Sequence, residues 1–209
     1  MNDMDKNTLI WRPMGQEDIP RIADWFWNAS DASLFDRSLP VPVSTDALRA
    51  QWSHAFEETT PPSAFWYIAE TENQTPLGIG GLEKINYIQG DAVLPFFVAE
   101  PFRKRGLARV MAISLTDMAF SQLRLHRLTT YYRSDNIGSK KILDRLGFTQ
   151  EGRLREGWFT DGIRKDIVVA GILGSEWASQ RDKVIADIEK NCSLTFSPNC
   201  WKAEIDRRY

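Results

Sequence analysis

Cysteine and histidine are scarce in this sequence of 209 residues, which contains two of each. The cysteines are Cys192 and Cys200, and the histidines are His54 and His126. Their spacing does not match a familiar set of zinc ligands, so no metal is expected. A low cysteine content is typical of proteins from the reducing cytoplasm, where we expect this protein, although the two thiols could pair.

The sequence also lacks an excess of positive charge, with 26 Lys and Arg residues against 28 Asp and Glu residues. Proteins that bind duplex nucleic acid or anionic membranes usually carry such an excess, so neither is an expected partner. No apolar run approaches the roughly 18 residues that a membrane-spanning helix needs. Residues 1–7 are polar and do not form a secretory signal.

Enough hydrophobic residues are present, at 43%, for the chain to bury one core of ordinary size. We place the domain at residues 8–174. Residues 175–209 then form a C-terminal helix, at 176–190, and a tail that contains aromatic residues. Three aromatic residues argue against a disordered tail, so we expect it to pack on the domain or on a second subunit of a homodimer. They are Phe196, Trp201 and Tyr209.

Periodicity and turn residues predict the elements of the first hundred residues. Helices are expected at 17–28 and at 44–58, separated by a loop at 29–43. Strands are expected at 8–12, 65–70, 77–85 and 92–98, the last three as an antiparallel meander. Long loops often carry specificity, so the 29–43 loop is a candidate for substrate selection.

Pro95 lies within the strand predicted at residues 92–98. Proline has no N–H to donate to a β-ladder, so its presence indicates a bulge or a place where the neighbouring strand moves away. Two alternatives remain open at this point: a simple bulge, and an opening that receives a ligand.

The apolar residues 93–98 lead through a polar turn into an amphipathic segment that begins near Gly106. This pattern predicts a strand, a tight loop and a helix over residues 105–123. The N–H groups of a helix's first turn lack intrahelical partners and lie at the positive end of the helix dipole. They therefore attract phosphate oxygens.

Small residues in this loop leave space for a ligand on the backbone, at Gly106 and Ala108. Arg103, Lys104 and Arg105 add positive charge at the same place. The loop is therefore predicted to bind an anion, although an ordinary basic helix N-terminus would look similar.

The second half of the sequence continues with a strand at 127–132, which a right-handed crossover makes parallel to the strand before the helix. A polar cap, an apolar stripe and a glycine stop predict a short helix over residues 136–147. Two further strands, at 149–155 and 165–173, are joined at Asp161-Gly162 as a hairpin.

Two of these segments together resemble the signatures of the GNAT acyltransferase superfamily. Arg103-x-x-Gly106-x-Ala108 is similar to its pyrophosphate-binding loop, and Asn136-x-x-Ser139 before a helix that ends in Gly147-Phe148 is similar to its second motif. The sequence from Gly147 to Asp166 looks in particular like the RimJ/RimL branch, which acetylates protein N-termini, amino sugars and similar amines.

The resemblance implies a mixed α/β fold. Its central sheet has seven strands, is mostly antiparallel, is flanked by helices and is splayed between strands 4 and 5, with a C-terminal helical extension here. The opening would receive the pantetheine arm of acetyl-CoA, the expected cosubstrate. The residues implied in binding it are Phe97, Val98, Arg103, Lys104, Arg105, Gly106, Leu107, Ala108, Arg109, Asn136 and Ser139.

Catalytic roles also follow from the resemblance. Many members have a tyrosine seven residues after the asparagine, where this chain has Leu143, whereas RimL-type members use the serine of the motif. Ser139 is therefore the candidate acid at the departing thiolate, unless its hydroxyl only satisfies backbone groups. Glu83 and Glu156 are the candidate bases, although either could be a solvated surface charge.

The expected activity is transfer of an acetyl group from acetyl-CoA to a primary amine, by direct attack in a ternary complex. The acceptor would be a small amine or a protein N-terminus, and its site would lie in the 29–43 loop and the hairpin around Trp158. The alternative is a GNAT fold that binds acyl-CoA as a sensor or docking module without turnover.

Overall fold

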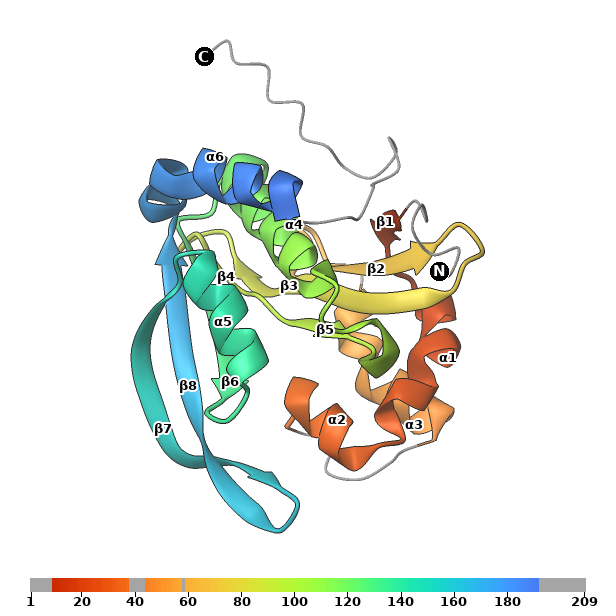
Figure 1. Cartoon of the computed structure of the whole chain (residues 1–209). Helices are drawn as coiled ribbons and strands as arrows, with labels where there is room; N and C mark the ends of the chain where they lie inside the picture. The colour runs from red at the N-terminus through yellow and green to blue at the C-terminus, as the bar shows by residue number, and fades with distance from the viewer. Residues whose placement is uncertain (1–8, 38–43, 58, 192–209) are drawn as a thin grey trace.

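The computed structural model describes residues 9–37, 44–57 and 59–191 (Figure 1). The expectations for Cys192, Cys200 and the three tail aromatics Phe196, Trp201 and Tyr209 lie outside the described residues. The same holds for residues 38–43 of the predicted loop.

A mixed sheet of eight strands forms the centre of the molecule, in the order β1-β2-β3-β4-β6-β8-β7, with β5 paired to β3. The strands are β1 (Leu9–Pro13), β2 (Phe65–Thr71), β3 (Pro76–Asn86), β4 (Asp91–Val93), β5 (Phe96–Val98), β6 (Arg127–Arg133), β7 (Thr149–Thr160) and β8 (Ile163–Leu173). Neighbouring strands are antiparallel except for β4 and β6, which are parallel. The predicted mixed, mostly antiparallel sheet is confirmed.

The sheet has eight strands where the sequence predicted seven, because the strand expected at 92–98 is divided. Val93 ends β4 and Phe96 begins β5, so Leu94 and Pro95 belong to neither strand. The fixed φ angle and missing N–H of a proline account for a break at this position.

The N-terminal helices differ from the prediction. The helix expected at 17–28 is three short pieces: η1 (Gln16–Asp18), α1 (Ile19–Ile22) and η2 (Ala23–Phe26). The prediction of a loop from residue 29 onward was wrong for residues 29–35, which form the helix α2 (Ala29–Phe35). Asn28 explains the difference, because its extended backbone ends the first segment and its side chain accepts hydrogen bonds from two N–H groups of α2.

Two hydrophobic clusters lie on either side of the sheet. One packs the N-terminal helices and α3 (Thr45–Gln51) against β2 and β5, and is rich in aromatic rings: Phe26, Phe35, Trp52, Trp66 and Phe97. The other lies beneath α4 (Leu107–Ser121), α5 (Ile137–Arg145) and α6 (Gly174–Asn191). Figure 1 shows α4, α5 and α6 grouped over one part of the sheet and α1, α2 and α3 grouped beside the other.

The helix α6 is anchored to α4 through a buried polar contact. Trp177 is 1% exposed, and its indole N–H donates to Asp117 at 3.1 Å. Arg181 also pairs with Asp117, so the carboxylate has a charged partner as well as a neutral donor. The start of the predicted C-terminal extension is therefore packed against the main core.

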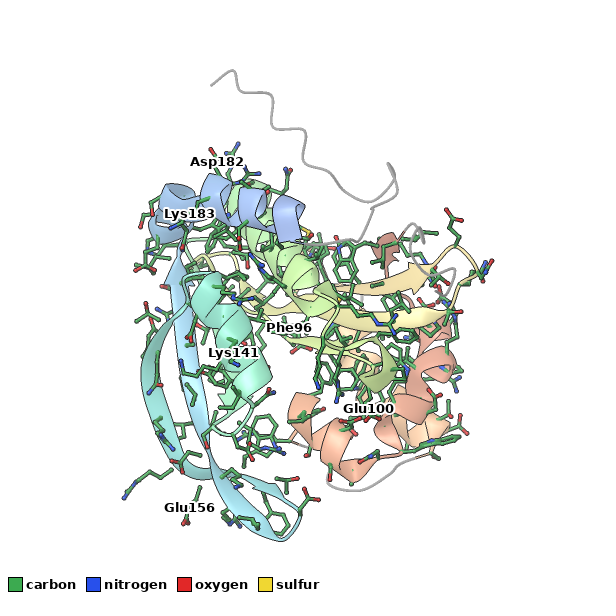
Figure 2. The ribbon with its side chains drawn as sticks, viewed as in Figure 1. Phe96, Glu100, Lys141, Glu156, Asp182 and Lys183 are labelled. Atoms are coloured by element: carbon green, nitrogen blue, oxygen red, sulfur yellow. The ribbon has the colours of Figure 1, made fainter. Side chains whose placement is uncertain are left out.

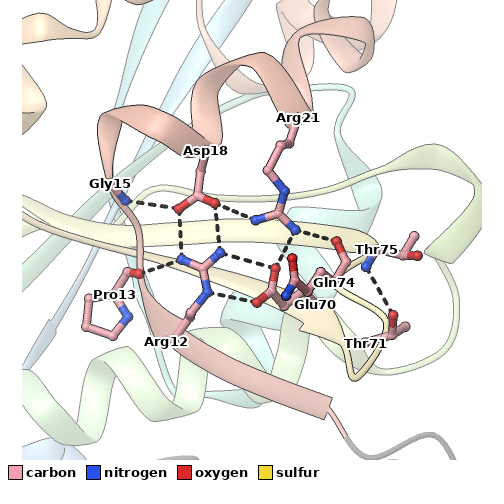
Figure 3. A network of polar contacts seen from close by, with 9 residues as sticks. All are labelled: Arg12, Pro13, Gly15, Asp18, Arg21, Glu70, Thr71, Gln74 and Thr75. Carbon is pink, nitrogen blue, oxygen red and sulfur yellow. Dashed lines mark hydrogen bonds and ion pairs between the residues drawn. The ribbon is translucent and has the colours of Figure 1, made fainter.

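A buried ionic network joins α1 to the first two strands (Figure 3). Asp18 is 1% exposed and receives bonds from Arg12, Arg21 and the Gly15 N–H, and both arginines also pair with Glu70. Burial alone would raise the pKa of Asp18, but these donors outweigh it and lower the pKa to about 2. The ionised carboxylate is therefore the form that the fold stabilises.

This network predicts a loss of stability in acid. Because the folded pKa of Asp18 lies below the unfolded value of 3.8, its contribution is complete above pH 4 and is lost as the pH falls toward 2. The pKa difference corresponds to about 2 kcal/mol. We expect Asp18→Asn to lower the free energy of unfolding at pH 6 and to flatten its decline between pH 4 and pH 2, measured by urea denaturation.

A matched control is Asp46→Asn, because Asp46 also pairs with an arginine, Arg49, but its side chain is 90% exposed. Exposed pairs contribute little, so this variant should retain the wild-type pH dependence. An Asp18→Asn variant with the wild-type pH dependence would contradict the assignment.

Candidate active site

Hydrogen bonding between the two halves of the sheet stops at Leu94. Its N–H donates to the Thr129 carbonyl at 2.8 Å, and its carbonyl accepts from the Thr130 hydroxyl at 2.9 Å. Beyond this point β5 pairs with β3, while β6 continues to Arg133 in contact with β8. The sheet therefore opens between β5 and β6, at the place that Pro95 indicated.

The divergence leaves one edge of β5 without a paired strand. The Pro95 carbonyl accepts from the Gly81 N–H, and the Ala99 N–H donates to the Leu77 carbonyl, both at 3.0 Å on the β3 side. Backbone polar groups alternate in direction along an antiparallel strand. The N–H groups of Phe96 and Val98 must therefore face the opening.

A cleft of about 560 Å³ occupies the opening. It is bordered by the N-terminal helices and β2 on one side and by β6, α5 and the β7–β8 hairpin on the other. The lining residues include Phe35, Asp36, Arg37, Trp52, Trp66, Glu83, Lys84, Pro95, Phe96, Thr130, Tyr131, Tyr132, Ser139, Leu143, Leu154 and Trp158.

Two of the three candidate catalytic residues meet in this cleft. Ser139 reaches it from α5, and Glu83 from β3. Glu156 does not line it: this residue lies on an irregular part of β7 with φ +53°, is exposed, and donates its backbone N–H to Asp166 at 2.8 Å. Figure 2 shows Glu156 near the hairpin, away from α5.

The second motif forms a capped helix start. Asn136 is the N-cap of α5, and its side-chain oxygen accepts from the Ser139 N–H at 3.0 Å. Asn136 therefore orders the start of the helix. Its Nδ2 group makes no hydrogen bond among the described residues and can donate to a ligand. The Ser139 hydroxyl makes no hydrogen bond among the described residues, so the capping interaction uses only its backbone.

Tyr132 also lines the cleft and carries a hydroxyl, and it was not singled out from the sequence. It is 6% exposed and lies on β6. Burial raises the pKa of its phenol, so the group stays protonated at neutral pH. Leu143, where the family resemblance placed a tyrosine in many members, lines the cleft with an aliphatic side chain.

The predicted anion loop has a backbone shape suited to phosphate. Lys104 and Gly106 have positive φ angles, of 64° and 87°, and Gly106 is the N-cap of α4. The N–H groups of Gly106, Leu107 and Ala108 donate to no backbone carbonyl within the part of the chain that the structure describes. Such turns at a helix N-terminus form concave sites for anions.

Most charged side chains of this loop are engaged within the protein. Arg103 donates to the Val98 carbonyl at 2.9 Å and pairs with Asp31 of α2 at 2.7 Å. Arg109 pairs with Asp187 of α6. The guanidinium of Arg105 lies over the Phe102 ring, 5.9 Å from its centre, while Lys104 is exposed.

The other predicted binding residues have apolar side chains. Phe97, Val98 and Leu107 are buried in the two hydrophobic clusters, at 6%, 6% and 4% exposure. Ala108 is half-buried. The polar atoms that Val98, Leu107 and Ala108 can present to a ligand are therefore main-chain atoms. Phe97 presents none to the opening, because the same alternation turns its N–H and carbonyl toward β3, and the N–H of its neighbour Phe96 faces the opening.

Sequence patterns missed the aromatic wall of the cleft. Trp66, Tyr132 and Trp158 come from three separate strands, and each appeared as ordinary strand composition. The only indication in the sequence was that the hairpin around Trp158 matches no motif, and this made the hairpin a candidate for acceptor selection.

The described residues include neither a metal-binding cluster nor a membrane-spanning helix. They contain no group of three or more His, Cys, Asp or Glu side chains arranged to hold a metal ion. Among them there is also no helix of the length and apolarity needed to cross a membrane.

Curated relatives are N-acetyltransferases of modest identity. The putative ribosomal N-acetyltransferase YdaF of Bacillus subtilis is 26% identical over 104 residues, which cover 50% of this chain and 57% of YdaF. The spermidine N(1)-acetyltransferase of Vibrio cholerae is 26% identical over 116 residues, 56% of this chain and 67% of that protein. The chain thus spans less than two thirds of YdaF.

Solved structures share the fold. The crystal structure of the Vibrio cholerae spermidine N-acetyltransferase in complex with CoA and spermine has a TM-score of 0.72 at 23% identity, and the match covers 82% of this chain and 98% of that one. At 23% identity this structural similarity is evidence for the fold alone, and it confirms the predicted architecture.

The family is established by a sequence model described as the Acetyltransferase (GNAT) domain, which matches residues 8–149. This range contains the opening between β5 and β6, the anion loop and the capped helix of the second motif, whereas β7 and β8 follow it. The chain therefore belongs to the GNAT acetyltransferase family, as its two motifs predicted.

Proposed function

We propose that this protein is an acetyl-CoA-dependent N-acetyltransferase that acetylates a primary amine by direct attack in a ternary complex. The observation that carries the proposal is the free edge of β5, which lies beside an anion loop at one end and a cleft with Ser139 and Glu83 at the other. Acetyl-CoA is the cosubstrate, and no metal takes part in the proposal.

Donor binding would use main-chain groups along this edge. The N–H groups of Gly106, Leu107 and Ala108 would hold the pyrophosphate, while those of Phe96 and Val98 would bind the pantetheine arm as an added strand does. The N–H nearest the thioester would stabilise its oxygen as negative charge develops. Asn136 would donate from Nδ2 to the same arm.

In the chemical step the neutral amine attacks the thioester carbonyl, the new C–N bond forms, and the C–S bond breaks. Glu83 would accept the proton that the amine loses, directly or through water. Ser139 would donate a hydrogen bond to the departing thiolate. A peptide α-amine, with a pKa near 8, needs less help in losing its proton than an alkylamine near 10.4.

The setting of the reaction is also part of the proposal. We place it in the cytoplasm, with a polyamine or a protein N-terminus as the acceptor, in line with the names of the two relatives. We treat residues 8–174 as the acetyltransferase domain, with a homodimer as one possible assembly.

Release of CoA tests the proposal most simply. We expect free thiol to appear, above the rate without amine, when acetyl-CoA is mixed with at least one of a tripeptide amide, spermidine and glucosamine. A thiol-reactive chromophore measures this directly. Binding of acetyl-CoA without thiol release from any acceptor would instead identify a non-catalytic sensor or docking module.

The anion loop is tested by Gly106→Val. A β-branched residue is strained at φ +87° and would also cover the backbone N–H groups, so we expect acetyl-CoA affinity to fall at least about ten-fold in calorimetry. Gly162→Val is the matched control, because Gly162 has φ +75° with no heavy atom within 4 Å of its added Cβ. It should show similar backbone strain with normal affinity, and equal affinity losses would remove the loop from the binding site.

Ser139→Ala tests the proposed hydrogen bond to the thiolate. We expect turnover to fall by up to about 100-fold with nearly unchanged acetyl-CoA affinity, because this bond strengthens only as charge develops on sulfur. The melting temperature should stay close to that of the wild type, since the hydroxyl has no hydrogen-bond partner among the described residues. Undiminished turnover, with a loss in Tyr132→Phe instead, would transfer the role to the phenol.

A further inference from the structure

The strand β3 contains one extra residue where it pairs with β4. Glu83 pairs with Val93. Three residues later on β3, Asn86 pairs with Asp91, which lies only two residues from Val93 on β4. Within this stretch Lys84 has a left-handed backbone, with φ +52°. An extra residue in one strand of an antiparallel pair is a β-bulge, and a bulge redirects the side chains beside it.

The bulge changes which face of the sheet the side chains of β3 meet. Side chains alternate between the two faces of a regular strand, so residues 82 and 84 would share one face and residue 85 would lie on the other. Instead, Leu82 and Ile85 both belong to the hydrophobic cluster beneath α4. Glu83 and Lys84, which are successive residues, both line the cleft. The bulge therefore turns Lys84 away from the core and places it beside Glu83 in the wall of the cleft.

Lys84 contributes an unpaired positive charge to this wall. The residue is exposed, and it makes no hydrogen bond or ion pair among the described residues. Both carboxylates that line the cleft, those of Asp36 and Glu83, have interactions within the protein. A left-handed backbone is uncommon for a residue with a long side chain, and conformations of this kind cluster at functional sites. The position and the free charge of Lys84 both indicate a ligand with a negative group.

We propose that the acceptor is a primary amine that also carries a carboxylate or phosphate group, and that Lys84 is the specificity-determining residue that pairs with this anion. Glu83 and Lys84 offer a carboxylate and an ammonium group from adjacent positions. Such an arrangement is complementary to a substrate that combines a positive amine with a negative group. A polyamine has only positive charges, so Lys84 would repel it. The proposal narrows the acceptor of the acetyltransferase function above and rests on that function.

Two matched pairs of acceptors test the preference at saturating acetyl-CoA. The α-amides of alanyl-glutamate and alanyl-glutamine have the same reactive amine and nearly the same shape, and only the first has a carboxylate. Glucosamine 6-phosphate and glucosamine form the phosphate pair. One charged hydrogen bond corresponds to a preference of roughly ten-fold in kcat/KM for the anionic member of at least one pair, and that pair identifies the anion. The preference should decrease in about 0.5 M NaCl, because salt screens the attraction.

Lys84→Gln removes the charge and keeps a polar side chain. We expect it to lower kcat/KM for the anionic acceptor about ten-fold and to change the value for its neutral counterpart by less than about two-fold. Lys183→Gln is the matched control, because Lys183 is also exposed but lies on α6 and does not line the cleft (Figure 2). It should leave both values unchanged.

A second variant guards against a change in folding. Asparagine tolerates a left-handed backbone better than most residues, so Lys84→Asn removes the charge and keeps the bulge. It should lose the same preference as Lys84→Gln. Both variants should bind acetyl-CoA with the wild-type affinity in calorimetry, since Lys84 lies on β3 and the proposed donor site is formed by β5 and the anion loop.

The outcomes separate this inference from the function on which it rests. A preference for an anionic acceptor that disappears in both Lys84 variants supports it. Equal rates within both pairs, CoA release that is fastest with spermidine, or a preference that either variant retains would overturn it and leave the acetyltransferase activity standing. An equal loss for neutral and anionic acceptors would also overturn it, because Lys84 would then act through Glu83. No CoA release with any of these amines would overturn both proposals.

Discussion

Backbone hydrogen bonding between β4 and β6 ends at Leu94, and the rest of the site depends on that interruption. Up to this residue the two strands pair in parallel, with Val93 opposite Thr129. After Pro95 the chain continues along β3 alone, so a row of N–H groups on β5 is left without strand partners. A sheet that remained closed would have neither the free edge nor the cleft.

An open sheet must be held apart, and a hydrophobic cluster on each side of the sheet supports it. On one side, the aromatic cluster around Phe26, Trp52 and Phe97 packs the N-terminal helices on β2 and β5. On the other side, α4, α5 and α6 cover the core that contains Leu128 and Trp177. Both clusters consist of buried hydrophobic side chains that fix the helices on the sheet, so the divergence of β5 from β6 is part of the packed fold.

The charged residues near the anion loop mainly hold it in place. Arg103 connects the end of β5 to α2 through the Val98 carbonyl and Asp31, and its guanidinium lies 5.3 Å from the centre of the Phe97 ring. Arg109 connects α4 to α6. The positive charges that the sequence suggested for anion binding are thus partly neutralised by carboxylates of the protein. In the proposed binding of the pyrophosphate, the main-chain N–H groups therefore contribute more than these side chains.

Much of this arrangement could be predicted from local patterns. Pro95 indicated the position of a bulge or an opening, Gly106 the turn before α4, and Asn136 the start of α5, because each residue acts through its own backbone or its immediate neighbours. The helix α2 was missed because Asn28 was taken as the end of one helix instead of the cap of the next. Its cap signal was present, but the small polar residues that follow also suit a loop.

The aromatic lining could not be predicted in the same way. Trp66 and Trp158 are separated by 92 positions in the sequence and line the same cleft only because β2 and β7 lie on the two sides of the opening. No short motif describes an arrangement of that kind. The distinction between Glu83 and Glu156 also needed the structure, since both are glutamates on strands and only one of them lines the cleft.

The central claim, that acetyl-CoA binds along the free edge of β5, can be tested by amide hydrogen exchange measured by NMR with and without CoA. The account predicts that the N–H groups of Phe96 and Val98 exchange rapidly in the free protein and become protected when CoA binds. The Ala99 N–H, which donates to Leu77, should be protected in both states. Unchanged exchange at Phe96 and Val98 under saturating CoA would contradict the account.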